Sequence, residues 1–325
     1  MAGSDLSDSI PETALGWHRE GKGAVLATVI ETWGSAPRRV GAQLAISGDG
    51  EIEGSVSGGC VEGAVIVEAL EALEEGALRE LEFGVSDGDA FAVGLACGGT
   101  IRVLVEPVGD VLPEALLADL CAARAARAPV AYVVDLDTGA RRLEHDGFET
   151  RFRMDSSGFE DESRTFVAIH NPPLRLIVVG AVHIAQALVP MARIAGYDPA
   201  IIDPRETFGA QARFPGETLL NDWPDEAVGQ LGLDSRTALV LLTHDPKLDD
   251  PALTLALRSG CFYIGALGST RTHAKRVARM QEAGFSEAEI ARIHGPVGLD
   301  IGAAGPSEIA VSILAEMTGV LRKGA

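Results

Sequence analysis

From residue 174 onwards, short apolar runs alternate with helix-like segments, and this alternation narrows the range of folds more than any other feature. Residues 174–179 (LRLIVV) form a continuous apolar run, and residues 183–195 form a helix-like segment that ends at Gly196. Apolar runs of this kind are typical of parallel strands that are buried on both faces. We therefore predict a Rossmann-like, doubly wound parallel sheet with helices on both faces. Further strands are expected at residues 199–202, 238–242 and 262–264, and further helices at residues 248–259, 270–283 and 306–322.

The first part of the chain is predicted to be a mixed α+β domain, which places the whole protein in the α/β class. Its apolar, β-branched runs indicate strands, and its segments with apolar residues on one face indicate helices. Strands are expected at residues 24–32, 43–46, 101–105 and 130–136, and helices at residues 60–74 and 112–126.

A connector is predicted between these two parts. Residues 137–171 carry Gly, Asp, Glu, Arg and Ser, and they suggest a hairpin with strand-like pieces around residues 149–154. The run Asn171-Pro172-Pro173 then interrupts the pattern, because consecutive prolines continue neither a helix nor a central strand. The predicted domains are residues 1–136, the connector 137–171 and residues 172–325.

Composition argues against several classes of partner. The formal net charge is −20, so nucleic acid and anionic membrane surfaces are not expected as partners. No apolar stretch has the roughly 20 residues that a membrane span needs, and no secretory signal is visible. The four cysteines are widely separated and show no CxxC spacing, so we expect a reducing, cytoplasmic compartment.

A partial dinucleotide fingerprint lies at the first junction between strand and helix in the second half. Gly180 and Ala185 fit the GxGxxG/A pattern, but Val182 stands where the pattern has its second glycine. That glycine allows the backbone to approach a pyrophosphate. Asp203, at the end of the next strand, is placed to bind a ribose hydroxyl. Two interpretations of this junction therefore stay open: it binds a nucleotide, or its small residues only pack the helix against the strand.

Other polar residues follow strands in the same half. His244 comes after the strand at 238–242, and Ser269 and Arg271 come after the strand at 262–264. Ligands bind outside the carboxyl ends of strands in open α/β sheets, and a helix that begins near Ser269 offers backbone N–H groups to an anion. Each of these residues has an alternative explanation as an ordinary turn or helix-cap residue.

Three glycine-rich motifs mark the first half: residues 34–42 (GSAPRRVGA), 57–63 (SGGCVEG) and 96–100 (ACGGT). Together with several motifs of the second half, among them Gly180-Ala181-Val182-His183, residues 201–208 (IIDPRETF) and residues 295–317, they resemble the XdhC/CoxI family. This family comprises accessory proteins of molybdenum hydroxylases such as xanthine dehydrogenase and carbon monoxide dehydrogenase. The resemblance covers residues 14–321.

The resemblance implies a protein that binds molybdenum cofactor, supports its sulfuration and delivers it to an apo molybdenum hydroxylase. It implies a cofactor-binding and insertion chaperone rather than a catalyst. Expected partners are the apo-hydroxylase, a cysteine desulfurase and a second copy of the chain in a homodimer. The alternatives are an NAD(P)-binding Rossmann oxidoreductase and a docking or regulatory scaffold for the hydroxylase.

The resemblance also suggests roles for the motif residues. Cys60, expected at the start of a helix, supplies a soft thiolate that contacts molybdenum or relays sulfur. Gly58 and Gly59 leave room for a bulky ligand. The remaining expected contacts to molybdenum cofactor are Cys97 with Gly98 as a second thiol site, Arg38 and Arg39 at the phosphate, and Glu62 at the pterin or as a helix cap. The candidate cofactor-binding residues of the second half, for a nucleotide or another anionic ligand, are Gly180, His183, Asp203, His244, Ser269 and Arg271.

Overall fold

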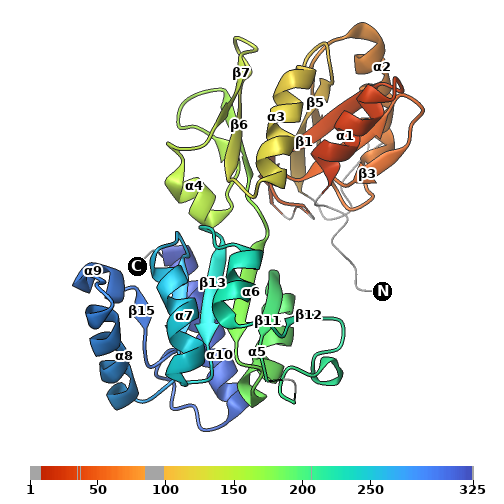
Figure 1. The fold of residues 1–325 in the computed structure, drawn as a ribbon. Helices are drawn as coiled ribbons and strands as arrows, with labels where there is room; N and C mark the ends of the chain where they lie inside the picture. The colour runs from red at the N-terminus through yellow and green to blue at the C-terminus, as the bar shows by residue number, and fades with distance from the viewer. Residues whose placement is uncertain (1–8, 35, 37, 85–98, 206, 324–325) are drawn as a thin grey trace. The chain divides into compact units, whose positions relative to one another are not determined.

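The computed structural model describes residues 9–34, 36, 38–84, 99–205 and 207–323. The chain forms two compact units, Met1–Pro172 and Pro173–Ala325 (Figure 1). The first unit contains antiparallel sheets and the second a parallel sheet, so the mixed α/β class predicted from the sequence is confirmed.

The first unit is built around a five-stranded antiparallel sheet in the order β3-β2-β1-β5-β4. Its strands are β1 (Ala24–Trp33), β2 (Gln43–Ser47), β3 (Ile52–Gly54), β4 (Arg79–Phe83) and β5 (Thr100–Pro107). Helix α2 (Glu62–Glu75) packs on one face, where Val65 and Ala69 contact the buried side chains of β1 and β5. Helices α1 (Ile10–Arg19) and α3 (Glu114–Ala125) contribute to the core on the other face.

A second, four-stranded sheet belongs to the same unit and has the order β7-β6-β9-β8. It consists of β6 (Val130–Asp135), β7 (Arg141–Glu144), β8 (Gly158–Phe159) and β9 (Thr165–His170). The strand-like pieces expected around residues 149–154 are wrong, because Glu149–Met154 form a helix, α4. Phe148 and Phe152 lie four residues apart, so one helix face directs both rings onto the small core around Val133.

The second unit contains a six-stranded sheet in the order β12-β11-β10-β13-β14-β15, with every neighbouring pair parallel. The predicted Rossmann-like sheet is therefore confirmed. Its strands are β10 (Leu174–Val179), β11 (Tyr197–Ile202), β12 (Thr218–Leu220), β13 (Thr237–Leu241), β14 (Tyr263–Ala266) and β15 (Ile293–His294). The short strands β12 and β15 were not expected from the sequence.

Helices cover both faces of this parallel sheet. Helices α5 (His183–Ile194) and α10 (Pro306–Lys323) share one core with β10 and β13, whereas α6 (Pro224–Leu231), α7 (Pro246–Leu257) and α8 (Thr270–Glu282) contribute to the other. A 3₁₀ turn at Gln211–Arg213 and the short helix α9 (Glu287–Ile290) complete the unit.

The junction between β10 and α5 requires glycine for a steric reason. Gly180 has a φ of 108°, a conformation that side-chain-bearing residues rarely adopt. A Cβ atom added there would lie 2.6 Å from Thr243 Cγ2, at the end of the neighbouring strand β13. Gly180 therefore lets two adjacent strand ends approach closely, whether or not a ligand binds there.

We expect Gly180→Ala to destabilise the protein by about 1–3 kcal/mol, because it adds backbone strain and a steric clash. Urea unfolding measures this change. Gly319→Ala is the matched control: Gly319 lies within α10 with no atom within 4 Å of an added Cβ, so this change should stabilise by about 0.5–1 kcal/mol. Equal effects of the two substitutions would contradict the packing argument.

Candidate functional site

The topology of the antiparallel sheet brings the described parts of the three glycine-rich motifs of the first unit to one end of the sheet. The motif at 34–42 connects the end of β1 to the start of β2, and the motif at 57–63 follows the end of β3. Strand β5 begins at this end too, since Trp33 pairs with Thr100 in the antiparallel register. Cys97 and Gly98 lie outside the described residues.

The carboxylate of Glu62 organises the Cys60 loop, which comprises residues 55–61 between β3 and α2 and carries Cys60. Its Oε1 accepts hydrogen bonds from Ser55 Oγ (2.6 Å) and from the Ser57 amide (2.9 Å). Its Oε2 accepts from Ser57 Oγ and from the Gly59 amide (2.9 Å). Burial alone raises the pKa of Glu62, but the hydrogen bonds from Ser55 and Ser57 outweigh it and lower the pKa to about 2. The loop therefore surrounds a carboxylate that is ionised at neutral pH.

The same network turns the Cys60 amide inward. Ser57 Oγ accepts hydrogen bonds from the amides of Cys60 and Val61, each at 2.9 Å. Gly58 and Gly59 have φ values of 74° and 108°, which reverse the chain direction without steric cost. Cys60 is exposed to solvent, whereas Ser57 and Val61 are buried.

The expectation that Cys60 begins a helix is wrong by two residues. Helix α2 begins at Glu62, and Val61 occupies the N-cap position. The position of the Cys60 backbone is therefore fixed by the hydrogen bond from its amide to Ser57 Oγ. Glu62 uses both carboxylate oxygens for donors of the loop that precedes α2, which differs from the helix cap considered from the sequence, since the structure shows no side-chain cap at the start of α2.

Arg38 and Arg39 lie in the connection between β1 and β2. Arg39 is exposed, and Arg38 is half-buried. Within the described part of the chain, the buried Nε of Arg38 has no hydrogen-bond partner. The guanidinium group of Arg38 thus keeps hydrogen-bonding capacity at the end of the sheet where the Cys60 loop begins.

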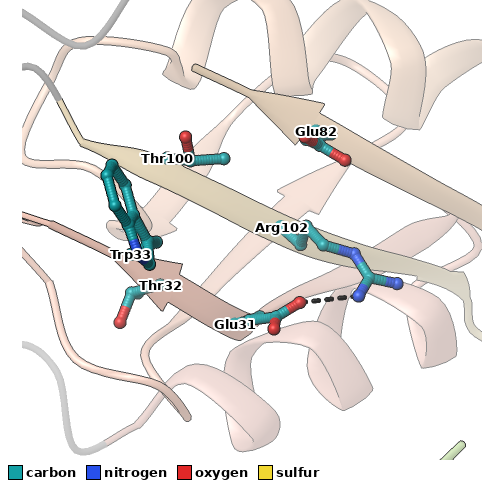
Figure 2. Close-up of a pocket in the computed structure, with 6 residues that line it drawn as sticks. All are labelled: Glu31, Thr32, Trp33, Glu82, Thr100 and Arg102. Carbon is teal, nitrogen blue, oxygen red and sulfur yellow. Dashed lines mark hydrogen bonds and ion pairs between the residues drawn. The ribbon is translucent and has the colours of Figure 1, made fainter. Parts of the chain in front are cut away.

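A pocket of about 440 Å³ lies at this end of the sheet (Figure 2). Strands β1, β4 and β5 supply its lining, which none of the sequence-based site predictions included. The lining residues are Glu31, Thr32, Trp33, Glu82, Thr100 and Arg102. No local pattern in the sequence predicted this pocket, because it depends on the pairing of β1 with β5.

In the second unit, the predicted site residues follow the carboxyl ends of parallel strands. Gly180 and His183 come after β10, Asp203 after β11, and His244 after β13. Ser269 and Arg271 come after β14. The sheet therefore gathers all six residues along one edge, in a unit separate from the one that carries Cys60.

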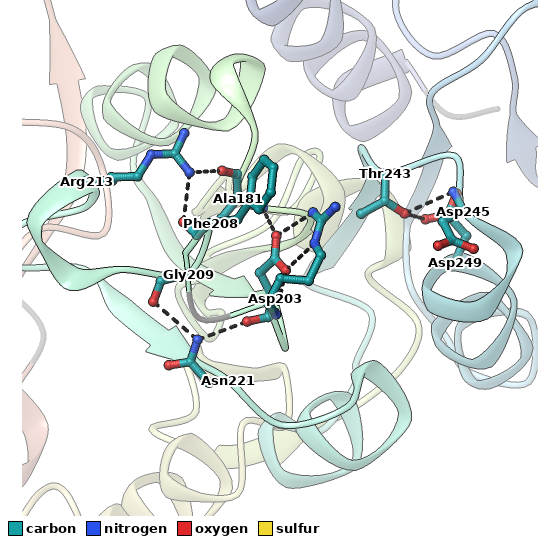
Figure 3. A network of polar contacts seen from close by, with 10 residues as sticks. Ala181, Asp203, Phe208, Gly209, Arg213, Asn221, Thr243, Asp245 and Asp249 are labelled. Carbon is teal, nitrogen blue, oxygen red and sulfur yellow. Dashed lines mark hydrogen bonds and ion pairs between the residues drawn. The ribbon is translucent and has the colours of Figure 1, made fainter.

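Asp203 is engaged by neighbouring protein groups (Figure 3). Its Oδ2 accepts from the Ala181 amide at 2.8 Å and from Arg205 Nη2 at 2.7 Å, while its Oδ1 accepts from Arg205 Nε at 2.8 Å. Burial raises the pKa of Asp203, but Arg205 and the Ala181 amide outweigh it, so the pKa lies below its usual value. Arg205, which the sequence-based predictions missed, thus donates hydrogen bonds to both oxygens of the carboxylate that was expected to bind ribose.

Val182 also differs from a phosphate-binding glycine. Its backbone is extended, with φ −87° and ψ 179°, and any residue adopts this conformation. Its side chain packs against the core that contains α5 and β10. His183 is the exposed first residue of α5.

A second polar network lies at the carboxyl ends of β13 and β14. Thr243 Oγ1 donates to Asp249 Oδ1 at 2.5 Å, and Asp249 Oδ2 lies 3.4 Å from Arg276 Nη2. His244, directly after Thr243, is exposed and has a φ of 48°, which is uncommon for a residue with a side chain. Ser269 caps α8 by accepting from the Thr272 amide.

A second cavity, of about 460 Å³, lies beside β14 and the start of α10. Its lining is mainly apolar, including Leu267, Val297 and Ile309, with Asp300 as its charged residue. Arg271 is exposed in the first turn of α8 and does not line this cavity.

No set of three or more His, Cys, Asp or Glu side chains in the described ranges is arranged to hold a metal ion. Among the helices that the structure describes, none is long and apolar enough to cross a membrane.

Each of the two units matches a known protein family model. The model of the XdhC and CoxI family matches residues 17–84, and that of the XdhC Rossmann domain matches residues 176–317. The molybdenum cofactor insertion chaperone PaoD of Escherichia coli (strain K12) is 36% identical over 300 residues, which are 92% of this chain and 84% of PaoD. A probable xanthine dehydrogenase subunit of Bacillus subtilis (strain 168) is 26% identical, over 90% of this chain and 92% of that protein.

A solved structure has a similar fold along nearly the whole chain. It is a crystal structure described as a xanthine dehydrogenase from Bacillus halodurans, with a TM-score of 0.62 and 27% identity. The match covers 97% of this chain and 96% of the other.

We expect Glu62→Gln to destabilise the first unit by about 1–3 kcal/mol, because the buried donors of the loop lose their charged acceptor. The folded-state pKa of about 2 lies below the usual value of 4.5. The unfolded chain therefore binds more protons between these values, and stability rises with pH across that window.

Urea unfolding of the parent and of Glu62→Gln from pH 2 to pH 7 tests this expectation. The parent's advantage should be fully present above about pH 4.5 and should shrink as the pH falls towards 2. Glu74→Gln, at an exposed position in the last turns of α2, is the control. A difference between parent and Glu62→Gln that does not change with pH would show that the carboxylate does not stabilise the loop.

Proposed function

The chain belongs to the XdhC and CoxI family, and on this premise we propose that it carries molybdenum cofactor to an apo molybdenum hydroxylase. The hydroxylase would be of the xanthine dehydrogenase or carbon monoxide dehydrogenase type. The observation that carries the proposal is the relation to PaoD, a molybdenum cofactor insertion chaperone, because it extends through both units at 36% identity. The cofactor is the cargo in this proposal, not a permanent part of the protein.

The loop of Cys60 is the proposed contact with the cargo. A thiolate is a soft ligand of the kind that suits molybdenum, and Cys60 is exposed on a loop whose backbone is held by buried hydrogen bonds. Gly58 and Gly59 are exposed beside it, and an added Cβ at Gly59 would meet no atom within 4 Å. A bulky ligand can therefore approach the thiol from this side.

Cations near the loop would hold the phosphate of the cofactor. Arg38 has a buried Nε without a described hydrogen-bond partner, and Arg39 is exposed in the same connection. Guanidinium groups bind phosphate through paired, charge-assisted hydrogen bonds. The two arginines are thus proposed to orient the cargo, with the thiol of Cys60 at its sulfur-bearing end.

The proposal includes further partners and a compartment. A cysteine desulfurase would supply sulfur for the cofactor, and a homodimer stays a prediction. A reducing cytoplasm would keep the thiol of Cys60 available for the cargo.

A resident nucleotide in the second unit is the less supported idea. The Asp203 carboxylate accepts from Ala181 and Arg205, and Val182 stands where the fingerprint has the glycine that lets the backbone approach a pyrophosphate. We expect calorimetric titration with NAD(H) and NADP(H) to show no binding up to millimolar ligand. Saturable binding of either cofactor at micromolar concentration would favour the oxidoreductase alternative.

Replacement of the thiol tests the main proposal. Cys60→Ser keeps the backbone amide that Ser57 holds, so the loop should stay folded while the soft ligand is lost. We expect protein from a molybdenum-replete host to contain molybdenum and pterin near one per chain. Cys60→Ser should lower either the bound cofactor or the rate of its delivery to an apo-hydroxylase about tenfold or more.

The control is Cys121→Ala, because Cys121 is half-buried in α3, away from the motifs. Unchanged molybdenum content and unchanged delivery by Cys60→Ser would remove Cys60 from the site. Absence of molybdenum and pterin from the parent protein would contradict the carrier function itself.

A further inference from the structure

Trp33 ends strand β1 with 75% of its surface exposed, at the end of the sheet where the Cys60 loop lies. A single exposed aromatic residue needs no special explanation. Trp33, however, lines the pocket of about 440 Å³, a volume within the range of small-molecule sites. Figure 2 shows its indole beside Thr100, with Glu82 on the far side of β5.

The cation in this pocket is already paired. Arg102 Nη1 donates to Glu31 Oε2 at 2.6 Å, and Arg102 Nη2 donates to Glu80 Oε2 at 2.7 Å. The hydrogen bond that Arg102 donates to Glu31 raises the pKa of Arg102, so these pairs persist at neutral pH. Arg102 therefore fixes two carboxylates and is not available to bind an anionic ligand.

Glu82 differs from those two carboxylates. It is exposed, lines the pocket, and forms no hydrogen bond or ion pair within the described ranges of the chain. The pocket thus offers an aromatic face, the Glu82 carboxylate and the hydroxyl of Thr100. Its lining contains more acidic than basic groups, which disfavours phosphate and favours a flat ring that carries N–H donors.

A 2-amino-4-oxopyrimidine edge has this chemistry, because its amino group and adjacent ring N–H both point towards a single acceptor. A carboxylate accepts such donors in the way that Glu and Asp accept from base amino groups, and an exposed indole stacks on the ring face. Strand β5 separates β1 from β4, so one bicyclic ring system that lies across β5 can contact both Trp33 and Glu82.

We propose that this pocket holds the pterin ring of the cargo, stacked on Trp33 with its aminopyrimidinone edge on Glu82. The inference rests on the proposed carrier function and deepens it, since it gives the organic part of the cofactor its own subsite. Trp33 then sets the ring plane, and Glu82 selects 2-amino-4-oxo rings over rings that present a carbonyl at the same position.

Calorimetric titration of the full-length, cofactor-free protein with pterin and with lumazine tests the subsite, because lumazine replaces the 2-amino group by an oxo group. We expect pterin to bind about tenfold more tightly than lumazine, since the oxo group would face the Glu82 carboxylate. Pterin should also quench the fluorescence of Trp33.

Substitutions assign the two contacts. Trp33→Leu should weaken pterin binding between about fivefold and a hundredfold, whereas Trp33→Phe should retain most of the affinity and lose the fluorescence quenching. Glu82→Gln should remove the preference for pterin over lumazine. The matched controls are Trp223→Leu, at an exposed tryptophan of the second unit, and Glu74→Gln in α2; neither should change binding.

Parent protein without saturable pterin binding, equal affinity for pterin and lumazine, or unchanged binding by Trp33→Leu would each overturn the subsite. Molybdenum content separates this result from failure of the carrier function. If the parent and Trp33→Leu load cofactor equally well, the carrier function stands and the pterin subsite falls. If the parent loads no cofactor, the carrier function fails, while the pterin titration still decides whether the pocket binds this ring.

Discussion

The buried carboxylate of Glu62 is the interaction on which the candidate site of the first unit depends. It gathers two hydroxyls and two amides from the preceding loop, and it does so in the first turn of α2. Because α2 packs on the sheet through Val65 and Ala69, the loop is tied to the core of the unit. The thiol of Cys60 is exposed because its backbone faces inward, towards Ser57.

Sheet topology then adds residues that are far apart in the sequence. Trp33 ends β1, directly before the motif at 34–42, and it pairs with Thr100, which ends the motif at 96–100 and begins β5. The same end of the sheet holds the pocket of Trp33 and Glu82. A soft thiol, guanidinium groups and an aromatic face with a carboxylate thus belong to one unit, and they match the sulfur, phosphate and pterin parts of the proposed cargo.

Local patterns in the sequence predicted the second unit well and the first unit less completely. Apolar runs such as residues 174–179 identify buried parallel strands directly, and Gly180 marks the turn that follows. The helix at 149–154 was missed because tertiary contacts of its two phenylalanines decide its conformation. The engagement of Asp203 by Arg205 was readable in principle, since the two residues are separated only by Pro204. The pocket at Trp33 was not, because it depends on pairing between β1 and β5.

Alkylation of Cys60 by iodoacetamide, followed by peptide mass spectrometry, tests most directly whether the cargo lies against this thiol. Protein without cofactor and protein loaded with cofactor are compared, with the half-buried Cys121 as the internal reference. The account predicts rapid labelling of Cys60 in the cofactor-free protein and strong protection after loading, with no change at Cys121. Equal labelling rates of Cys60 in the two forms would contradict it.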